Sequence, residues 1–291
     1  MRLAMSFEPL PVYRHSGKFG IHGPIAAIVV AGAIGFPLGF VYAYAMKWVP
    51  FVYVNFLLTA GYGFAFGGAT GLLMKWARVR NTPVALLSGL IAGLLALYFN
   101  WNGHIHALFD GAPALNSWQG ILAGMQVLYE QGSWGLSHSG SVTGIPLAIV
   151  WVVEAIVIVG LAALISMAMV FDTPFCEKNQ CWLDKEKKIS TLQSFTDPEH
   201  VAALKAGDLG PLAQAKPRET GAMAFARLTL KHSPRTQEFC TVRVENVTVE
   251  TKNGETNERT QELTRDIMVP PATFELLSKF ESFTSGIPAA A

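Results

Sequence analysis

Long runs of hydrophobic residues, separated by short polar segments, fill the chain up to Phe171, and this pattern ends abruptly at Asp172. The longest run covers residues 145–171 and contains a single ionisable residue, Glu154. A helix needs roughly 20 apolar residues to cross the hydrocarbon core of a bilayer. Three earlier runs are also long enough, so the pattern predicts four membrane-spanning helices at residues 24–46, 51–74, 82–98 and 145–171.

Basic residues predict the orientation of these helices. Most of the flanking Lys and Arg residues fall on one side of the expected bundle, namely Arg2, Arg14, Lys18, Lys75, Arg78, Arg80, Lys178, Lys185, Lys187 and Lys188. The other side has only Lys47, and residues 99–144, also on that side, contain no Lys or Arg. The positive-inside rule then places both termini in the cytoplasm of a multi-pass protein in a plasma membrane, such as the bacterial inner membrane. Residues 1–23 would be a cytosolic N-terminal segment, and residues 24–171 the transmembrane domain.

The segment at residues 99–144 is too long for a simple connection between two spans. Within it, residues 117–129 place their apolar side chains along one helical stripe, with Asn116 or Ser117 as the N-cap. This pattern predicts an amphipathic helix that lies on the outer membrane surface or covers the end of the bundle.

The hydrophobic period changes from helical to alternating in the second half of the chain. Residues 222–231 and 239–245 alternate apolar and polar side chains, and a polar return strand is expected at 256–268 after a hairpin turn at Asn253-Gly254. Capping and proline signals predict one helix after Asp197 and another after residue 270. The expected fold is therefore an integral membrane all-α bundle followed, at 172–291, by a small cytosolic α+β domain with a three-stranded antiparallel meander.

Composition agrees with a membrane protein, since 51% of the residues are hydrophobic and 15% are charged. A soluble globular protein has about 25% charged residues. The net charge is +1, and no segment concentrates the basic charge that nucleic-acid binding requires. The chain also lacks phosphate-binding glycine loops and the sequence signatures of metalloproteases and serine hydrolases. No catalytic residue is predicted, and an enzyme is disfavoured.

Several glycines in the first three predicted spans are spaced four residues apart. They are Gly35 and Gly39; Gly63, Gly67 and Gly71; and Gly89 and Gly93. Small residues at this spacing share one helix face and allow two helix backbones to approach closely. The pattern favours intramolecular packing of the first three spans, with a pore lining or a subunit interface as the alternative.

Glu154 is the candidate intramembrane polar site. It lies about 13 Å along its span at 1.5 Å per residue, and a lipid-facing carboxylate there costs several kcal/mol. Its candidate partners are neutral side chains, namely Asn55, Thr59, Tyr42, Tyr44 and Tyr53. A neutral glutamic acid bonded to a tyrosine or an asparagine would indicate a structural role, whereas a continuous wet path would indicate proton or cation handling.

Two residue groups are candidate metal ligands. His104 and His106 would share one face of an extended segment and could bind zinc or copper with Asp110 or His138. Cys176 and Cys181 have the spacing of half a zinc knuckle, which Cys240 with His232 or His200 could complete. Interfacial histidines and ordinary cysteines explain both patterns as well, so zinc is a secondary hypothesis and the cofactor requirement stays open.

Three functions are compatible with these features. The favoured one is a non-enzymatic membrane protein that displays a cytosolic interaction or oligomerisation domain, with lipids and a protein partner or a second copy as partners. The second is an oligomeric channel or a small-solute or ion transporter that uses Glu154. The third is a metal-binding membrane protein that uses the histidines or the cysteines.

Overall fold

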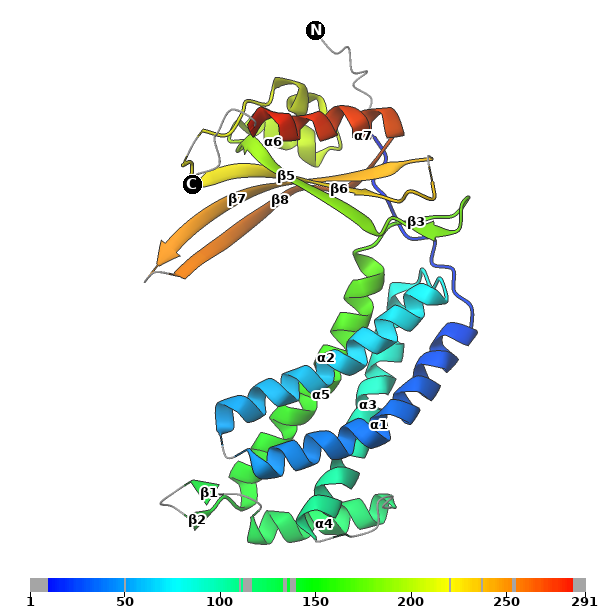
Figure 1. The fold of residues 1–291 in the computed structure, drawn as a ribbon, viewed down its shortest axis with the longest axis vertical. Coiled ribbons are helices and arrows are strands. Elements are labelled where there is room, and N and C mark those ends of the chain that lie inside the picture. The colour runs from blue at the N-terminus through cyan, green and yellow to red at the C-terminus, as the bar shows by residue number, and fades with distance from the viewer. Residues whose placement is uncertain are drawn as a thin grey trace. The chain divides into compact units, whose positions relative to one another are not determined.

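The computed structural model describes residues 10–49, 51–109, 111, 117–132, 135–136, 140–219, 221–236, 238–252 and 255–284. These residues form two compact units (Figure 1). The helical unit is Ser16–Asp172, and the sheet unit combines the described residues of 10–15 with those of 173–284.

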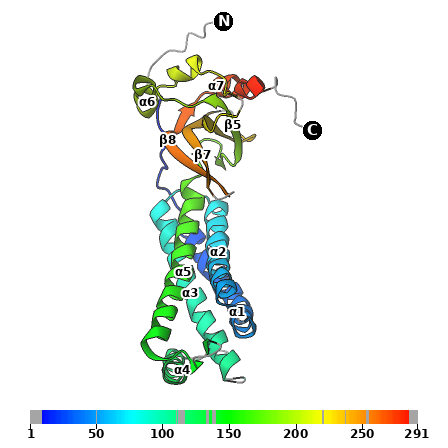
Figure 2. The same ribbon diagram turned by 90° about the vertical axis from the view of Figure 1, so that its left-hand side faces the viewer.

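Four long helices make up most of the helical unit and lie side by side (Figures 1 and 2). They are α1 (His22–Trp48), α2 (Val52–Trp76), α3 (Thr82–Leu108) and α5 (Gly144–Phe171). All four are long and apolar enough to cross a membrane. The four spans predicted from the sequence are therefore present as helices.

Helix α3 is longer than the sequence predicted, because it continues past Tyr98 to Leu108. Its start is capped by Asn81, whose side chain accepts a hydrogen bond of 3.0 Å from the backbone N–H of Val84. The prediction ended the span early because Asn100 and Asn102 lower the local hydropathy. Both asparagines are buried, so tertiary packing favours continuation of the helix through them.

A shorter helix and two short strands connect α3 to α5. Helix α4 (Trp118–Gln131) covers the predicted amphipathic stretch, and the Ser117 side chain caps it by accepting a bond from Gly120 N–H at 3.1 Å. The strands β1 (Gly135–Leu136) and β2 (Gly140–Ser141) pair with each other. Asn116, the other N-cap candidate, lies outside the described residues.

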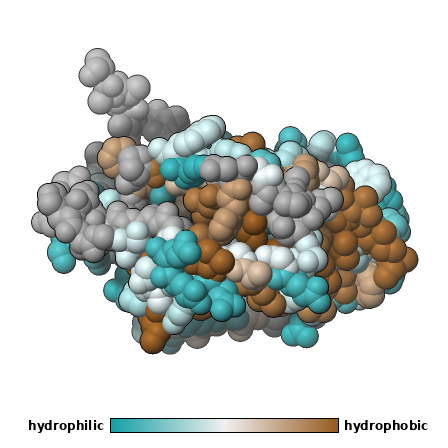
Figure 3. All heavy atoms as spheres, turned by 90° about the horizontal axis from the view of Figure 1, so that it is seen from below, coloured by the Kyte–Doolittle hydropathy of each residue, from teal (hydrophilic) through white to brown (hydrophobic). Residues whose placement is uncertain are grey.

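Large apolar side chains are exposed along the four long helices, which agrees with their length and apolar composition. Examples are Val29, Leu57, Leu87 and Ile156, which are between 57% and 69% exposed. Seen from below, broad areas of hydrophobic residues reach the surface (Figure 3). A soluble bundle would bury such residues.

The sheet unit contains a four-stranded antiparallel sheet in the order β5-β6-β7-β8. Its strands are β5 (Lys185–Gln193), β6 (Ala224–His232), β7 (Cys240–Lys252) and β8 (Glu255–Val269). A small hairpin, β3 (Phe175–Cys176) with β4 (Cys181–Trp182), precedes the sheet. The remaining elements are α6 (Pro198–Lys205), η1 (Gly210–Gln214), α7 (Pro271–Ser278) and η2 (Lys279–Thr284).

The predicted three-stranded meander was one strand short, because β5 lacks a clear alternating pattern. Its first four residues are the charged run Lys185–Lys188, and burial begins only at Ile189. The β7–β8 hairpin was predicted, and Lys252 pairs with Glu255 at its end. Its turn residues, Asn253 and Gly254, lie outside the described residues.

One face of the sheet carries the hydrophobic core of the sheet unit. Leu228, Leu230, Val242 and Val244 are fully buried there, and side chains from α6, η1 and α7 cover them. The α6 helix begins where the sequence predicted, since Asp197 accepts a hydrogen bond from Glu199 N–H at 2.9 Å.

The N-terminal residues join this unit, which the sequence did not indicate. Val12 bridges to Ile267 of β8. Two backbone hydrogen bonds of 2.9 Å flank this bridge, from Tyr13 N–H to the Asp266 carbonyl and from Met268 N–H to the Pro11 carbonyl. Residues 11–13 thus extend the sheet along the β8 edge.

Candidate functional site

Glu154 of α5 lies in a polar cluster to which all four long helices contribute. Its Oε1 accepts a hydrogen bond of 2.8 Å from the Tyr42 hydroxyl of α1. The same oxygen accepts a bond of 3.0 Å from Asn100 Nδ2 of α3. Both described partners of the carboxyl are thus neutral side chains.

Helix α2 completes the cluster through a chain of hydroxyl groups. The Tyr42 hydroxyl lies 2.7 Å from Thr59 Oγ1, and either atom can be the donor. Thr59 Oγ1 in turn bonds the backbone carbonyl of Asn55, one helical turn earlier, at 2.9 Å. The cluster therefore links the carboxyl on α5 to the first turns of α2.

Aromatic rings enclose the cluster. The rings of Tyr42 and Tyr62 stack with centroids 4.7 Å apart and an interplanar angle of 13°. The Tyr62 hydroxyl donates to the Ala96 carbonyl at 3.0 Å, and His104 lies with its ring 6.2 Å from that of Tyr42. This packing restricts the rotation of Tyr42 and holds its hydroxyl on Glu154.

Three buried polar atoms near this cluster have no hydrogen-bond partner among the described residues. They are Asn55 Oδ1, Asn100 Oδ1 and His104 Nδ1. Asn100 is 2% exposed. Buried polar atoms without partners are rare in proteins, and all three of these can accept a hydrogen bond. The cluster is therefore richer in acceptors than in donors.

Of the side chains predicted as partners of Glu154, some lie in the cluster and others do not. Tyr42 and Thr59 belong to the cluster. Tyr44 bonds His106 Nδ1 at 3.0 Å instead, and Tyr53 is 88% exposed. Asn55 contributes its backbone carbonyl to the chain. Sequence reasoning missed Asn100, because it treated the region after Tyr98 as a loop.

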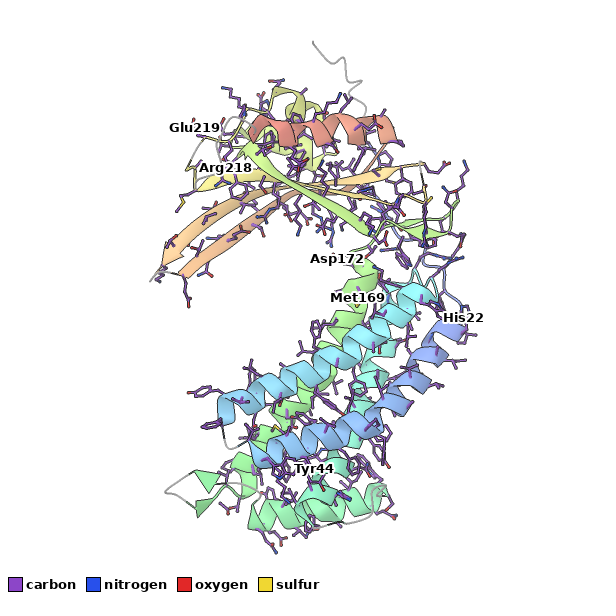
Figure 4. All side chains as sticks on the ribbon, in the orientation of Figure 1. His22, Tyr44, Met169, Asp172, Arg218 and Glu219 are labelled. Atoms are coloured by element: carbon purple, nitrogen blue, oxygen red, sulfur yellow. The ribbon has the colours of Figure 1, made fainter. Side chains whose placement is uncertain are left out.

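The predicted packing glycines lie at close helix contacts, but five of the seven contact α5 and not another of the first three spans, so the expected packing among those three spans was incomplete. A Cβ atom at Gly39 would lie 2.6 Å from the Phe99 carbonyl oxygen, and one at Gly89 would lie 2.5 Å from the Ala162 carbonyl oxygen. The same holds at Gly35 against Phe99, at Gly63, Gly67 and Gly71 against α5, and at Gly93 against Val159. Figure 4 labels Met169 near the C-terminal end of α5, where its sulfur atom faces Gly71.

The two candidate histidines lie within α3 and not in an extended segment, so the expected shared face is wrong. Residues two apart on a helix point in different directions. His104 packs on the rings of Tyr42 and Trp101, whereas His106 contacts Phe40 and Tyr44. Figure 4 labels Tyr44 on α1. Asp110 and His138, the proposed third ligands, lie outside the described residues.

The three cysteines of the sheet unit are buried and free. Cys176 and Cys181 face each other across the β3–β4 hairpin, and Cys240 pairs with Val269 in the main sheet. Burial raises the pKa of the Cys181 and Cys240 thiols above the usual value. Over the described part of the chain, no three His, Cys, Asp or Glu side chains come together as a metal site would require.

Charged side chains of the sheet unit form pairs on the sheet. Asp266, in a left-handed backbone conformation with φ of 43°, binds Arg243 at 3.0 Å and lies 3.5 Å from Lys231. The guanidinium of Arg218 lies over the Phe225 ring at 4.0 Å, and Figure 4 shows Arg218 beside the sheet. These charged side chains thus make their contacts within the sheet unit.

Comparisons of the chain with protein-family models, with curated proteins and with solved structures gave no match. The class that the fold itself defines is a protein with four candidate membrane-spanning helices and a small antiparallel sheet unit.

Proposed function

We propose that this protein anchors and displays a small interaction domain. In this proposal the helical unit spans the bacterial inner membrane with both termini in the cytoplasm. The sheet unit is held at the cytoplasmic surface, where it binds a protein partner or a second copy of the chain. The proposed function is non-enzymatic and requires no cofactor.

The observation that carries the proposal is that each unit has a hydrophobic core of its own. The core of the helical unit includes Phe66, Ile158 and Ala162, and that of the sheet unit includes Leu228 and Val244. The glycine contacts bring the long helices together in the interior of the bundle. A tightly packed bundle of this kind favours an anchoring role over a role in which the bundle encloses a substrate.

The β7–β8 hairpin supports the interaction role. The pairing of β6 with β7 ends at Ala224 and Thr248, whereas β7 and β8 remain paired as far as Lys252 and Glu255. The end of the hairpin is thus a two-stranded arm, and residues 255–262 are all exposed. Exposed strand edges can pair with a strand of another chain.

Photo-crosslinking tests the interaction role. A photoreactive amino acid in place of Asn257, which is exposed and pairs with Glu250 on the arm, should give crosslinked dimers of the chain or one defined adduct in membranes. The same amino acid in place of Glu199, on the exposed surface of α6, is the matched control and should give neither. Equal crosslinking at both positions, or none at the arm, would contradict the proposal.

The second candidate function is conduction of protons or cations through the helical unit. The observation that favours it is the set of buried acceptors beside Glu154. Glu154→Gln in liposomes separates the two functions. An anchor should keep its assembly with this substitution and show no flux in either form, whereas a conducting protein should lose a flux that the unsubstituted chain supports.

A further inference from the structure

We infer that the cluster around Glu154 is a proton-binding site whose carboxyl exchanges its proton through Tyr42 and Thr59, from one end of the bundle. The inference goes beyond the anchoring function. It concerns a site that an anchor does not need, and different measurements test it.

The hydrogen-bond chain from Glu154 to α2 has too few protons if the carboxyl is ionised. Three contacts of 2.8, 2.7 and 2.9 Å join four oxygens, namely Glu154 Oε1, the Tyr42 hydroxyl, Thr59 Oγ1 and the Asn55 carbonyl. A carboxylate and a carbonyl only accept hydrogen bonds. With an ionised Glu154, the two hydroxyl protons would have to serve three contacts, so one contact would lack a proton.

A protonated Glu154 removes this deficit. The carboxylic acid then donates to Tyr42, Tyr42 donates to Thr59, and Thr59 donates to the Asn55 carbonyl. Each contact has one proton, and the Asn100 amide still donates to the carboxyl. The protonated form also avoids a charge within a membrane-spanning helix, where a carboxylate is costly.

Proton uptake along this chain is balanced. A hydronium ion gives its proton to Thr59 Oγ1 and becomes water, and the earlier Thr59 proton moves to the Tyr42 oxygen. The earlier Tyr42 proton moves to Glu154 Oε1, where a new O–H bond forms. Rotation of the Thr59 hydroxyl onto the Asn55 carbonyl then gives the arrangement in which each contact has one proton, and release runs through the same steps in reverse.

The polar atoms around Glu154 extend toward one end of the bundle. From Glu154, the polar atoms follow α2 to Asn55 in its first turn and follow α3 to His104, near its last turn. Asn55 Oδ1, an acceptor, and the ring nitrogen His104 Nδ1 are both buried and have no described partner. The polar atoms of α2 and those of α3 both lead to the end of the bundle where α1 is followed by α2. A proton that enters from this end therefore meets polar groups.

Apolar packing occupies the other direction. The side chains that follow Glu154 toward the opposite end include those of Phe66, Ala92, Ala96, Ile158 and Ala162, all 0% exposed. The buried hydroxyls of Thr70, Ser88 and Ser166 lie farther along the helices. The apolar packing separates the site from that end. A proton can therefore bind and leave without crossing the bundle.

Few other titratable groups face the site from the surrounding helices. Tyr62 of α2 and His104 of α3 lie beside Tyr42. Lys47 and Lys75 lie in the last turns of α1 and α2, and His106 is bonded to Tyr44. Among the described residues of the four long helices, no Asp and no other Glu accompanies Glu154.

Infrared spectroscopy of the full chain in lipid nanodiscs tests the site directly. A protonated carboxylic acid has a carbonyl stretching band that a carboxylate lacks. We expect this band at neutral pH, its loss in Glu154→Gln, and its retention in the matched control Glu130→Gln, which changes an exposed residue of α4. If no Glu154-dependent band exists, or if sodium ions abolish it at constant pH, the inference is wrong.

Deuterium exchange of the same band tests the path. Tyr42→Phe and Thr59→Val should slow exchange of the Glu154 proton, and Tyr42→Phe should also shift the band because the hydrogen bond that the carboxylic acid donates to Tyr42 is lost. Tyr62→Phe is the matched control on the apolar side and should exchange like the unsubstituted chain. Equal slowing by Tyr62→Phe would overturn the one-sided path.

The two proposals can fail separately. If Glu154→Gln does not assemble, the shift of the band in Tyr42→Phe still assigns it to Glu154, and an unshifted band contradicts the inference. A proton flux through the unsubstituted chain would overturn the anchoring function while leaving the proton site intact.

Discussion

Asn100 donates a hydrogen bond of 3.0 Å to Glu154 although the two residues are 54 positions apart in the sequence. The bond joins α3 to α5, and Asn100 is 2% exposed. Together with the Tyr42 bond it fixes the rotation of three helices about a single carboxyl oxygen. Interhelical hydrogen bonds of this kind contribute to the stability of membrane proteins in the range of about 0.6 to 2 kcal/mol.

Asn100→Leu should therefore destabilise the helical unit by about 1 to 2 kcal/mol, because it removes a donor from Glu154 and keeps a similar volume. The measurement is the midpoint of unfolding of the full chain in mixed micelles. Asn55→Leu is the control, since the Asn55 side-chain oxygen has no described partner and the Thr59 bond uses the backbone. Equal losses in both variants would contradict the role given to Asn100.

The spans could be predicted from the sequence because hydropathy is a property of consecutive residues. The sequence could not identify which of several candidate side chains bind Glu154, because this depends on how each helix is rotated about its axis. Tyr42 and Thr59 were candidates among several, and Asn100 lay in a segment that hydropathy assigned to a loop. Burial against the neighbouring helices keeps that segment helical.

Gly89 and Gly68 form a matched pair for testing helix contact. A Cβ at Gly89 would lie 2.5 Å from the Ala162 carbonyl oxygen, whereas a Cβ at Gly68 would have no heavy atom within 4 Å. Gly89→Ala should cost about 1 to 3 kcal/mol, because α3 and α5 must separate. Gly68→Ala should be neutral or stabilise α2 by up to about 1 kcal/mol, as expected for Gly to Ala in a helix. Thermal unfolding of both variants is the measurement, and similar midpoints would refute the contact.

His232 makes the stability of the sheet unit depend on pH. Burial lowers the pKa of His232 below its ordinary value, Lys185 and Lys187 act in the same direction, and Asp184 opposes them. The folded chain therefore prefers the neutral ring, and the unfolded chain binds the proton more readily. The stabilisation is complete above about pH 6.5 and is lost as the pH falls below that value.

Urea unfolding of the full chain at neutral and at mildly acidic pH measures this effect, with modification of the buried Cys240 thiol as the reporter of the sheet unit. The midpoint should fall in acid for the unsubstituted chain and change less for His232→Gln. His200→Gln, on α6, is the control and should behave like the unsubstituted chain. A pH effect that persists in His232→Gln would assign it to another group.

The sheet unit shows a different limit of sequence reasoning. Alternation identified β6 and β7, because apolar side chains recur at every second residue, at Ala226, Leu228 and Leu230 of β6 and at Cys240, Val242 and Val244 of β7. Strand β5 begins with four charged residues, so its pattern resembles a linker until Ile189. The pairing of Val12 with Ile267 brings together opposite ends of the chain, and no local pattern in either segment predicts it.

Tyr13 tests whether this N-terminal attachment stabilises the sheet unit. Its hydroxyl accepts a hydrogen bond of 2.9 Å from the Phe175 N–H, and its ring stacks on Phe239 at 6.2 Å between centroids. Tyr13→Phe keeps the stacking but removes the acceptor, which should cost about 1 to 2 kcal/mol locally, because a backbone N–H loses its partner. Hydrogen exchange at β3 should become faster, while exchange at β6 should not change.

Two comparisons make this prediction specific. Tyr13→Leu also removes the stacked ring and should accelerate exchange at β3 further than Tyr13→Phe does. Tyr53→Phe changes a tyrosine that is 88% exposed on α2 and should leave β3 unchanged. Because the hydroxyl and the ring contact different residues, a graded response would show that both attach residues 10–15 to the sheet unit. Unchanged exchange at β3 in both Tyr13 variants would mean that the hairpin is held without the N-terminal segment.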